Sequence, residues 1–212
     1  MRFLMLVSEA ITQLKTSEVK QLGLKDSDAD ILGFINFGIL ELYKRFPLWE
    51  AEAVITQATD VVLYTLADGA ANVVIDLSDH NLLTILKVWD EDDNFYIINN
   101  EKDPDSLKTP KYNQLKVAAA SVVDGYVMTV DYRAAPLFLT SVSDVIPLPV
   151  QFLEALFTYV GYKGQSSVKV GVKDENNAHY IRFEAACERI KTEGLFAGND
   201  LESTKFEQST YV

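Results

Sequence analysis

The strongest constraint on the fold is the order of patterns along the chain, because helical patterns stand at both ends and strand patterns fill the centre. Residues 146–190 hold two helix-patterned segments, each with an apolar stripe, joined by a short polar link. Residues 31–50 hold another helix pattern, which stops at Pro47. Roughly ninety residues of strand pattern separate these helical ends. This order predicts helices drawn from both ends of the chain and a sheet formed by the middle.

Two helices are expected before residue 50. Apolar residues recur at helical spacing over 3–15, which indicates a first amphipathic helix. Ser27 is the expected N-cap of the second helix, and Pro47 ends it. The second helix is apolar on two faces. One face comprises Ile31, Phe34, Ile35, Ile39, Leu42 and Phe46, and the other comprises Phe37, Leu40 and Tyr43.

A helix that is apolar on two faces has to be buried on two faces. Its own bundle covers one face, and the pattern leaves two accounts of the other. Either a neighbouring subunit packs on this helix, or the helix lies deep inside its own bundle. Gly33 and Gly38 lower its intrinsic stability but allow a neighbour to approach closely. The residues alone leave both accounts open.

The centre of the chain reads as short strands. Seven β-branched or aromatic runs are each bounded by Asp, Asn, Gly or Pro, which is typical of an antiparallel sandwich or small barrel. No helical pattern intervenes, so a parallel sheet is disfavoured. The runs are AVIT, VVLYTL, NVVIDL, LLTILKVW, FYII, YNQLKV and GYVMTVDYR.

Two further helices are expected after the strands. Pro149 suits the first turn of a helix that should end near Gly164, with GYKGQSS as its cap and turn. The last helix is expected from about 174 to Gly194. Its expected buried face comprises Ala178, Ile181, Ala185 and Ile190.

The expected fold class is α+β: a helical bundle built from both ends of the chain, with an inserted antiparallel β-sandwich or small barrel. The bundle takes residues 1–50 and 146–195, and the β domain takes 51–145. Residues 196–212 are expected to form an extended C-terminal tail. Its sparse apolar residues suit anchoring on a partner, and they include Leu201, Phe206 and Tyr211.

The charge and the cysteine count exclude some classes of protein. A net charge of −12 argues against binding of nucleic acid, because an acidic chain repels phosphate. The same charge would suit a wall along which a duplex slides without sticking, although a plain acidic surface explains it too. The single cysteine excludes an internal disulfide and fits a reducing cytoplasm. We expect no leader peptide and no membrane span.

The densest acidic cluster lies between two expected strands. Asp90, Asp92, Asn94 and Glu101 stand at the spacing of an EF-hand calcium loop. Phe95, however, occupies the position where that loop requires glycine, and the flanking runs are strands. A solvated hairpin turn is therefore the better interpretation.

The sequence contains no catalytic constellation. Cys187 and His179 lie about 12 Å apart by helix rise on one expected helix, too far for a catalytic pair. No phosphate-binding loop, dinucleotide fingerprint or nucleophile elbow occurs. We therefore expect no enzymatic activity, no cofactor and no metal.

Several stretches resemble the head-to-tail adaptor proteins of short-tailed bacteriophages, also called connector or tail tubular proteins. The resemblance runs from about 28 to 195 in the order helix, β insertion, helix, link, helix. The stretches that carry it are ILGFINFGILELYKRFPLWE, VWDEDDNFYIIN, KYNQLKV, TVDYRAAP, IPLPVQFLEALFTYVGYKGQSS and HYIRFEAACERIKTEGL.

The resemblance implies a virion structural protein that forms a ring, most often of twelve copies, at the head-tail junction. Such a ring docks on the portal protein, extends the DNA channel and offers a platform to the tail nozzle. It would be made and assembled in the host cytoplasm, without a membrane, and genomic DNA would pass through it without specific binding. By position, the helix shared between subunits would carry Phe34, Phe37 and Tyr43. The portal anchors would be Leu201, Phe206 and Tyr211.

Two other classes of function stay open. A nozzle or other neck protein would bind the adaptor and not the portal. A non-viral ligand-binding module would use the β domain as its pocket, which a metal titration of the acidic cluster would test.

Overall fold

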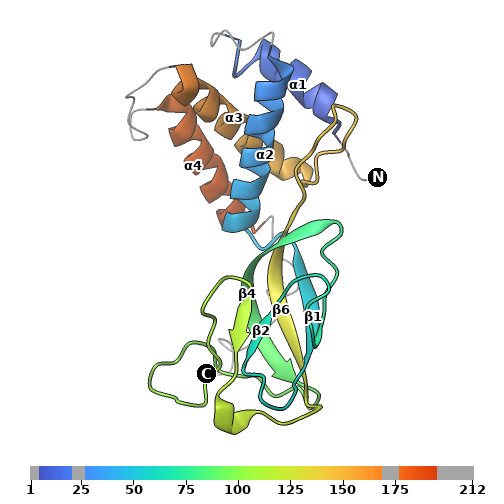
Figure 1. Ribbon diagram of the computed structural model, residues 1–212. Helices are drawn as coiled ribbons and strands as arrows, with labels where there is room; N and C mark the ends of the chain where they lie inside the picture. The colour runs from blue at the N-terminus through green and yellow to red at the C-terminus, as the bar shows by residue number, and fades with distance from the viewer. Residues whose placement is uncertain (1–4, 21–26, 169–176, 195–212) are drawn as a thin grey trace, which may run out of the picture. The chain divides into compact units, whose positions relative to one another are not determined.

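The computed structural model describes residues 5–20, 27–168 and 177–194, and the chain divides into two compact units (Figure 1). The helical unit combines 1–46 with 138–212, and the β unit is 47–137. Residues 138–145, which the sequence grouped with the strands, belong to the helical unit. The predicted α+β class is confirmed, with helices and an antiparallel sheet in one chain.

Helices from both ends of the chain make up the helical unit. Phe46 at the end of α2 packs edge-to-face on Phe152 at the start of α3, so these two helices run antiparallel. Glu154 early in α3 pairs with Arg189 late in α4, so α3 and α4 are antiparallel too. As a result α2 and α4 run in the same direction (Figure 1). The elements are α1 Val7–Thr16, α2 Asp28–Arg45, the short 3₁₀ turn η2 Val150–Phe152, α3 Leu153–Val168 and α4 Ala178–Thr192.

Local polar groups start the helices where the sequence suggested. The Glu9 carboxylate accepts the Leu6 N–H at 2.9 Å and closes the first turn of α1. Ser27 occupies the N-cap of α2, and its hydroxyl donates a hydrogen bond to the Asp30 carboxylate. Asn177 caps α4, its side-chain oxygen accepting the N–H groups of two following residues. These three starts agree with the predicted helix positions to within a few residues.

Two predictions about the C-terminal helices were wrong. The helix expected to end near Gly164 continues to Val168, so GYKGQSS is helical and not a cap. Gly161 serves close packing instead, since a Cβ there would lie 2.6 Å from the His179 ring nitrogen Nδ1. The expected buried face of the last helix was also wrong at three of its four positions, because Ala178, Ile181 and Ala185 are exposed whereas Ile190 is buried. Its buried residues are Phe183, Ala186, Cys187 and Ile190.

The β unit contains a four-stranded antiparallel sheet of order β3-β1-β6-β4 and a two-stranded ribbon of β2 and β5. The sheet and the ribbon share one apolar core, into which Tyr64 and Leu115 of the ribbon and Val130 and Tyr132 of the sheet are buried. The run FYII was predicted to be a strand. In the structure it is an irregular segment after β4 that takes part only in isolated bridges. The strands are β1 Glu50–Thr56, β2 Leu63–Thr65, β3 Val73–Val74, β4 His80–Asp90, β5 Gln114–Lys116 and β6 Val127–Pro136.

Alternation along the strands sorts the sheet into a buried face and an open face. On β6, Val130 and Tyr132 point into the core, whereas Asp131 lies on the opposite side. Register places Asp131 between Glu52 of β1 and Lys87 of β4. The open face is therefore charged.

Candidate interaction surface

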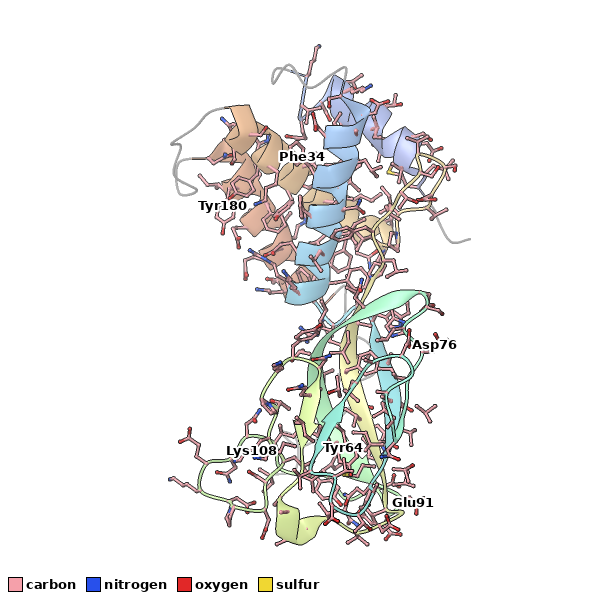
Figure 2. All side chains as sticks on the ribbon, in the orientation of Figure 1. Phe34, Tyr64, Asp76, Glu91, Lys108 and Tyr180 are labelled. Atoms are coloured by element: carbon pink, nitrogen blue, oxygen red, sulfur yellow. The ribbon has the colours of Figure 1, made fainter. Side chains whose placement is uncertain are left out.

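The three residues assigned to a shared helix occupy three different environments on α2. Phe37 is 50% exposed, and Phe34 is half-buried (Figure 2). Tyr43 is buried within the unit, and its hydroxyl donates a 2.6 Å hydrogen bond to the Pro147 carbonyl. Burial raises the pKa of Tyr43 to about 12, so the hydroxyl keeps its proton at neutral pH. Of the three, Phe37 is the side chain that offers the most surface to another molecule.

Phe138 joins Phe37 on this surface, and the sequence analysis missed it. The two rings meet edge-to-face with centroids 6.3 Å apart, and Phe138 is 53% exposed. We call the Phe37–Phe138 pair the aromatic face. The stretch LFL at 137–139, directly after the last strand, was a signal, because it places three bulky apolar residues in a loop without helical or strand alternation.

The loop that carries Phe138 is held firmly on α2. The Asn36 side chain donates to the Leu139 carbonyl at 2.9 Å and accepts the Leu139 N–H at 2.8 Å. The same loop accepts the N–H groups of Val7 and Ser8 at the start of α1. A buried amide that satisfies both backbone polar groups of one residue fixes the backbone in place there. These hydrogen bonds therefore hold the aromatic face in a defined position within the helical unit.

An arginine links α2 to α4. Arg45 Nη1 donates to Glu184 at 2.9 Å, and its guanidinium lies 4.7 Å from the centroid of the Phe183 ring. Although burial alone would lower the pKa of Arg45, its bonds to Glu184 and Glu41 raise it overall. The same contact lowers the pKa of Glu184. Both groups are thus charged at neutral pH, and the pair sets the spacing of two helices.

The expected portal anchors Leu201, Phe206 and Tyr211 lie outside the described residues. Their role stays a prediction from the resemblance.

The acidic cluster is organised as a turn. Asp90 accepts the backbone N–H groups of Asp92 and Asn94 through one carboxylate oxygen, each at 2.9 Å. Its other oxygen accepts the Tyr126 hydroxyl at 2.8 Å. The Asn94 side chain contributes most to lowering the pKa of Asp90 to about 2. Among the described residues no group of three His, Cys, Asp or Glu side chains could hold a metal ion.

Cys187 and His179 serve packing in this structure. Burial raises the pKa of the Cys187 thiol to about 11, so the reactive thiolate is scarce at neutral pH. His179 Nδ1 lies 2.8 Å from Glu18, and Arg182 holds both oxygens of the same carboxylate. These contacts join the end of α1 to the start of α4.

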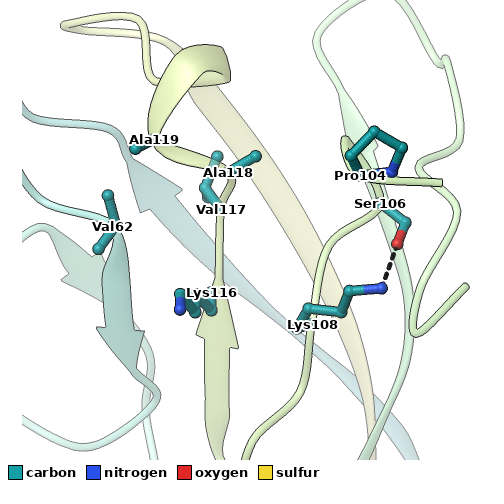
Figure 3. Close-up of a pocket in the computed structure, with 8 residues that line it drawn as sticks. All are labelled: Val62, Pro104, Ser106, Lys108, Lys116, Val117, Ala118 and Ala119. Carbon is teal, nitrogen blue, oxygen red and sulfur yellow. Dashed lines mark hydrogen bonds between the residues drawn. The ribbon is translucent and has the colours of Figure 1, made fainter. Parts of the chain in front are cut away.

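Two cavities of the β unit are candidates for binding sites. One of about 400 Å³ lies between the ribbon and the loop before it (Figure 3). Its Lys108 Nζ is already bonded to Ser106 Oγ at 2.7 Å and to the Asn100 carbonyl at 2.5 Å. A second, of about 410 Å³, is lined by Leu86, Phe95 and Ile98 beside β4. Neither brings together the convergent polar groups of a catalytic or cofactor site.

Comparison with known proteins places the chain in a family. Residues 1–200 match the family described as SU10 adaptor protein, which covers both structural units. No curated protein matches the chain. Among the described residues, no helix combines the length and apolarity needed to cross a bilayer. The chain therefore belongs to the SU10 adaptor protein family and is a phage adaptor, a structural protein of the virion.

Proposed function

We propose that this chain is a head-to-tail adaptor whose copies form a ring, about twelve by the family resemblance, that docks on the portal protein. The ring would extend the DNA channel and carry the tail nozzle. The observation that carries this proposal is the family match over 1–200, supported by the exposed and rigidly held aromatic face. Adaptors act by fitting against other head and tail proteins, and such a face offers the contact area.

The charge of the chain supports a channel role. Twelve copies with a net charge of −12 each would surround the DNA with negative charge. A duplex repelled by the wall is not held by counterion release, so it can pass quickly. Phe34, Phe37 and Tyr43 are proposed to act at the subunit contact, Tyr43 by positioning α2 from inside the unit. Leu201, Phe206 and Tyr211 are proposed as the portal anchors.

The test is the mass of the purified chain, alone and mixed with purified portal ring, by mass photometry or sedimentation. We expect the portal to gain the mass of a full ring, about twelve chains of 23.7 kDa. A truncation that ends at residue 195 should keep the ring-forming surface but should no longer bind the portal ring, because it removes the proposed anchors.

Two outcomes would contradict the proposal. A chain that ignores the portal at low and moderate salt, yet binds an assembled portal and adaptor complex, would be a nozzle or neck protein. A chain that retards duplex DNA with a steep salt dependence would contradict the inert channel wall.

A further inference from the structure

Two lysines stand directly opposite each other on neighbouring strands of the β unit (Figure 3). The Lys108 N–H donates to the Lys116 carbonyl at 2.9 Å, and the Lys116 N–H donates to the Lys108 carbonyl at 2.7 Å. Residues paired in this way place their side chains on one face, and like charges so placed repel. We call Lys108 and Lys116 the lysine pair. Within the described part of the chain, neither forms an ion pair, and Lys108 Nζ donates to the neutral groups of Ser106 and Asn100.

Two carboxylates stand directly opposite each other on the open face of the sheet. Register pairs Glu52 of β1 with Asp131 of β6, and we call these two residues the carboxylate pair. The Asp131 Oδ1 atom is buried and has no hydrogen-bond partner among the described residues. Burial first, and then Glu52, raise the pKa of Asp131 to about 6, although Lys87 of β4 opposes them. The carboxylate pair therefore lowers the stability of the free β unit.

The two pairs point away from opposite sides of one core. Leu115, next to Lys116, is buried in the core that the ribbon shares with the sheet, and so is Val130, next to Asp131. Because neighbouring side chains of a strand point to opposite faces, Lys116 points out of the ribbon and Asp131 points out of the sheet. A single β unit therefore carries opposite charges on opposite sides, and the two pairs cannot meet within one copy.

An apolar rim accompanies each pair. Leu63, the register partner of Lys116 on β2, is 44% exposed. Val54 lies two residues along β1 from Glu52 and therefore on the same face, and its register partner Val74 is 73% exposed. Apolar contact around a charged group excludes water and strengthens its pairing. A second copy of this chain presents the complement of both surfaces at once.

We propose that the lysine pair of one copy packs on the carboxylate pair of the next copy, so that the β units contact one another around the ring. The proposal rests on the ring assembly proposed above and adds a second interface to it. Unlike surfaces make a heterologous contact, which is the kind that closes into a ring. Neighbours in a ring of about twelve copies differ by a rotation of about 30°, so each copy needs contact surfaces on nearly opposite sides.

The first test exchanges the two charges. Lys116→Glu and Glu52→Lys should each weaken self-association of the free chain, and ring assembly on purified portal ring, by about tenfold or more, because each places like charges at the contact. A chain that carries both substitutions should assemble like wild type, because every contact then has its signs exchanged. Mass photometry over a range of chain concentrations measures assembly.

Two controls separate this contact from damage to the fold. Each single substitution relieves repulsion within its own pair, so the temperature of thermal unfolding should not fall. Lys20→Glu and Glu91→Lys make the same changes of charge at other exposed residues and should assemble like wild type.

The second test maps the contact in the wild-type chain. A carbodiimide joins a lysine to a carboxylate without adding a spacer, so it links only groups that touch. Unlabelled and isotope-labelled copies are mixed, assembled on the portal ring and treated with this reagent. Mass spectrometry should then find Lys116 linked to Glu52 or Asp131 in peptides that combine the two isotopes.

Each outcome decides one proposal. Rings without this cross-link, single variants that assemble like wild type, or a folded chain with both substitutions that does not assemble would overturn the contact. Loss of duplex DNA binding, and not of assembly, in Lys116→Glu would assign the lysine pair to nucleic acid and would also overturn it. Cross-linked copies that do not bind the portal would contradict the adaptor function and leave the contact standing.

Discussion

The helical unit and the β unit use their charged side chains at different ranges. In the helical unit Arg45 reaches Glu184 and Arg182 reaches Glu18, pairs separated by more than a hundred residues of sequence. In the β unit Asp76 and Asp103 accept N–H groups only two residues ahead. Long-range pairs form only once the helices are assembled, whereas turn carboxylates act while the chain is still local. The two ion pairs of the helical unit therefore depend on tertiary packing, whereas these two carboxylates of the β unit stabilise local turns.

The largest expected change in stability concerns two glycines of α2, and it tests whether the helical unit depends on packing between helices. Gly38→Val should destabilise the helical unit by about 2 to 3 kcal/mol, because a Cβ there would lie 2.6 Å from the Leu156 side chain of α3. Gly33→Ala should stabilise it by up to about 1 kcal/mol, since the site is open and alanine favours helix. Urea unfolding with hydrogen exchange of α2 and α3 measures both. Equal effects at the two sites would show that α2 and α3 do not pack as described.

The next effect tests a buried polar group of the β unit. Tyr132→Phe should lower the free energy of unfolding of this unit by about 1 to 2 kcal/mol. The reason is that the Tyr132 hydroxyl lies 2.7 Å from Nε2 of His80, which is buried and would lose a partner. Tyr112→Phe, at a 63% exposed ring, is the matched control. Loss of exchange protection should stay within 47–137, and spread into α2 or α4 would contradict the division into units.

A third prediction concerns pH. Burial first, and then the carboxylates of Glu52 and Glu50, raise the pKa of Asp131 to about 6, although Lys87 opposes them. A raised carboxyl pKa means that the folded state holds its proton longer, so stability falls as pH rises from about 4 to 6 and stays lower above. Asp131→Asn should remove this penalty. It should stabilise the β unit by about 1 kcal/mol at pH 8, a value reduced for solvent screening, and by little at pH 4.

Thermal unfolding at the two pH values measures this difference, with Glu91→Gln as a control at an exposed carboxylate of the same unit. A gain that is equal at both pH values would exclude titration of Asp131 as its cause.

The smallest effect is expected at the exposed end of the inter-helix network. Arg182→Ala should cost less than about 1 kcal/mol, because Arg182 is 55% exposed and water screens its pair with Glu18. A double-mutant cycle with Glu18→Gln isolates the coupling, and added salt should reduce it. A coupling well above this range would mean that long-range charge contributes more to the helical unit than its exposure suggests.

Features that depend on residues close together in the sequence could be predicted, whereas contacts between residues distant in the sequence could not. The N-cap position of Ser27 and the end of α2 before Pro47 were predicted correctly, because each depends on neighbours a few residues away. The stop at Gly164 was wrong because a helical glycine can equally serve packing, as Gly161 does against His179. Among the surface residues, Phe37 was noticed on α2, but Phe138 was missed because its partner lies a hundred residues away in sequence.

The last helix separates the two kinds of information most clearly. Its sequence alone determined that it is helical and that apolar residues stand on two sides, since both follow from spacing along the chain. It did not determine which side is the core. That was decided when Phe183 met Tyr159 of α3 and the Arg45 guanidinium of α2, contacts that large rings make and that alanines cannot. Periodicity records which residues share a face, but only packing against other elements selects the face to be buried.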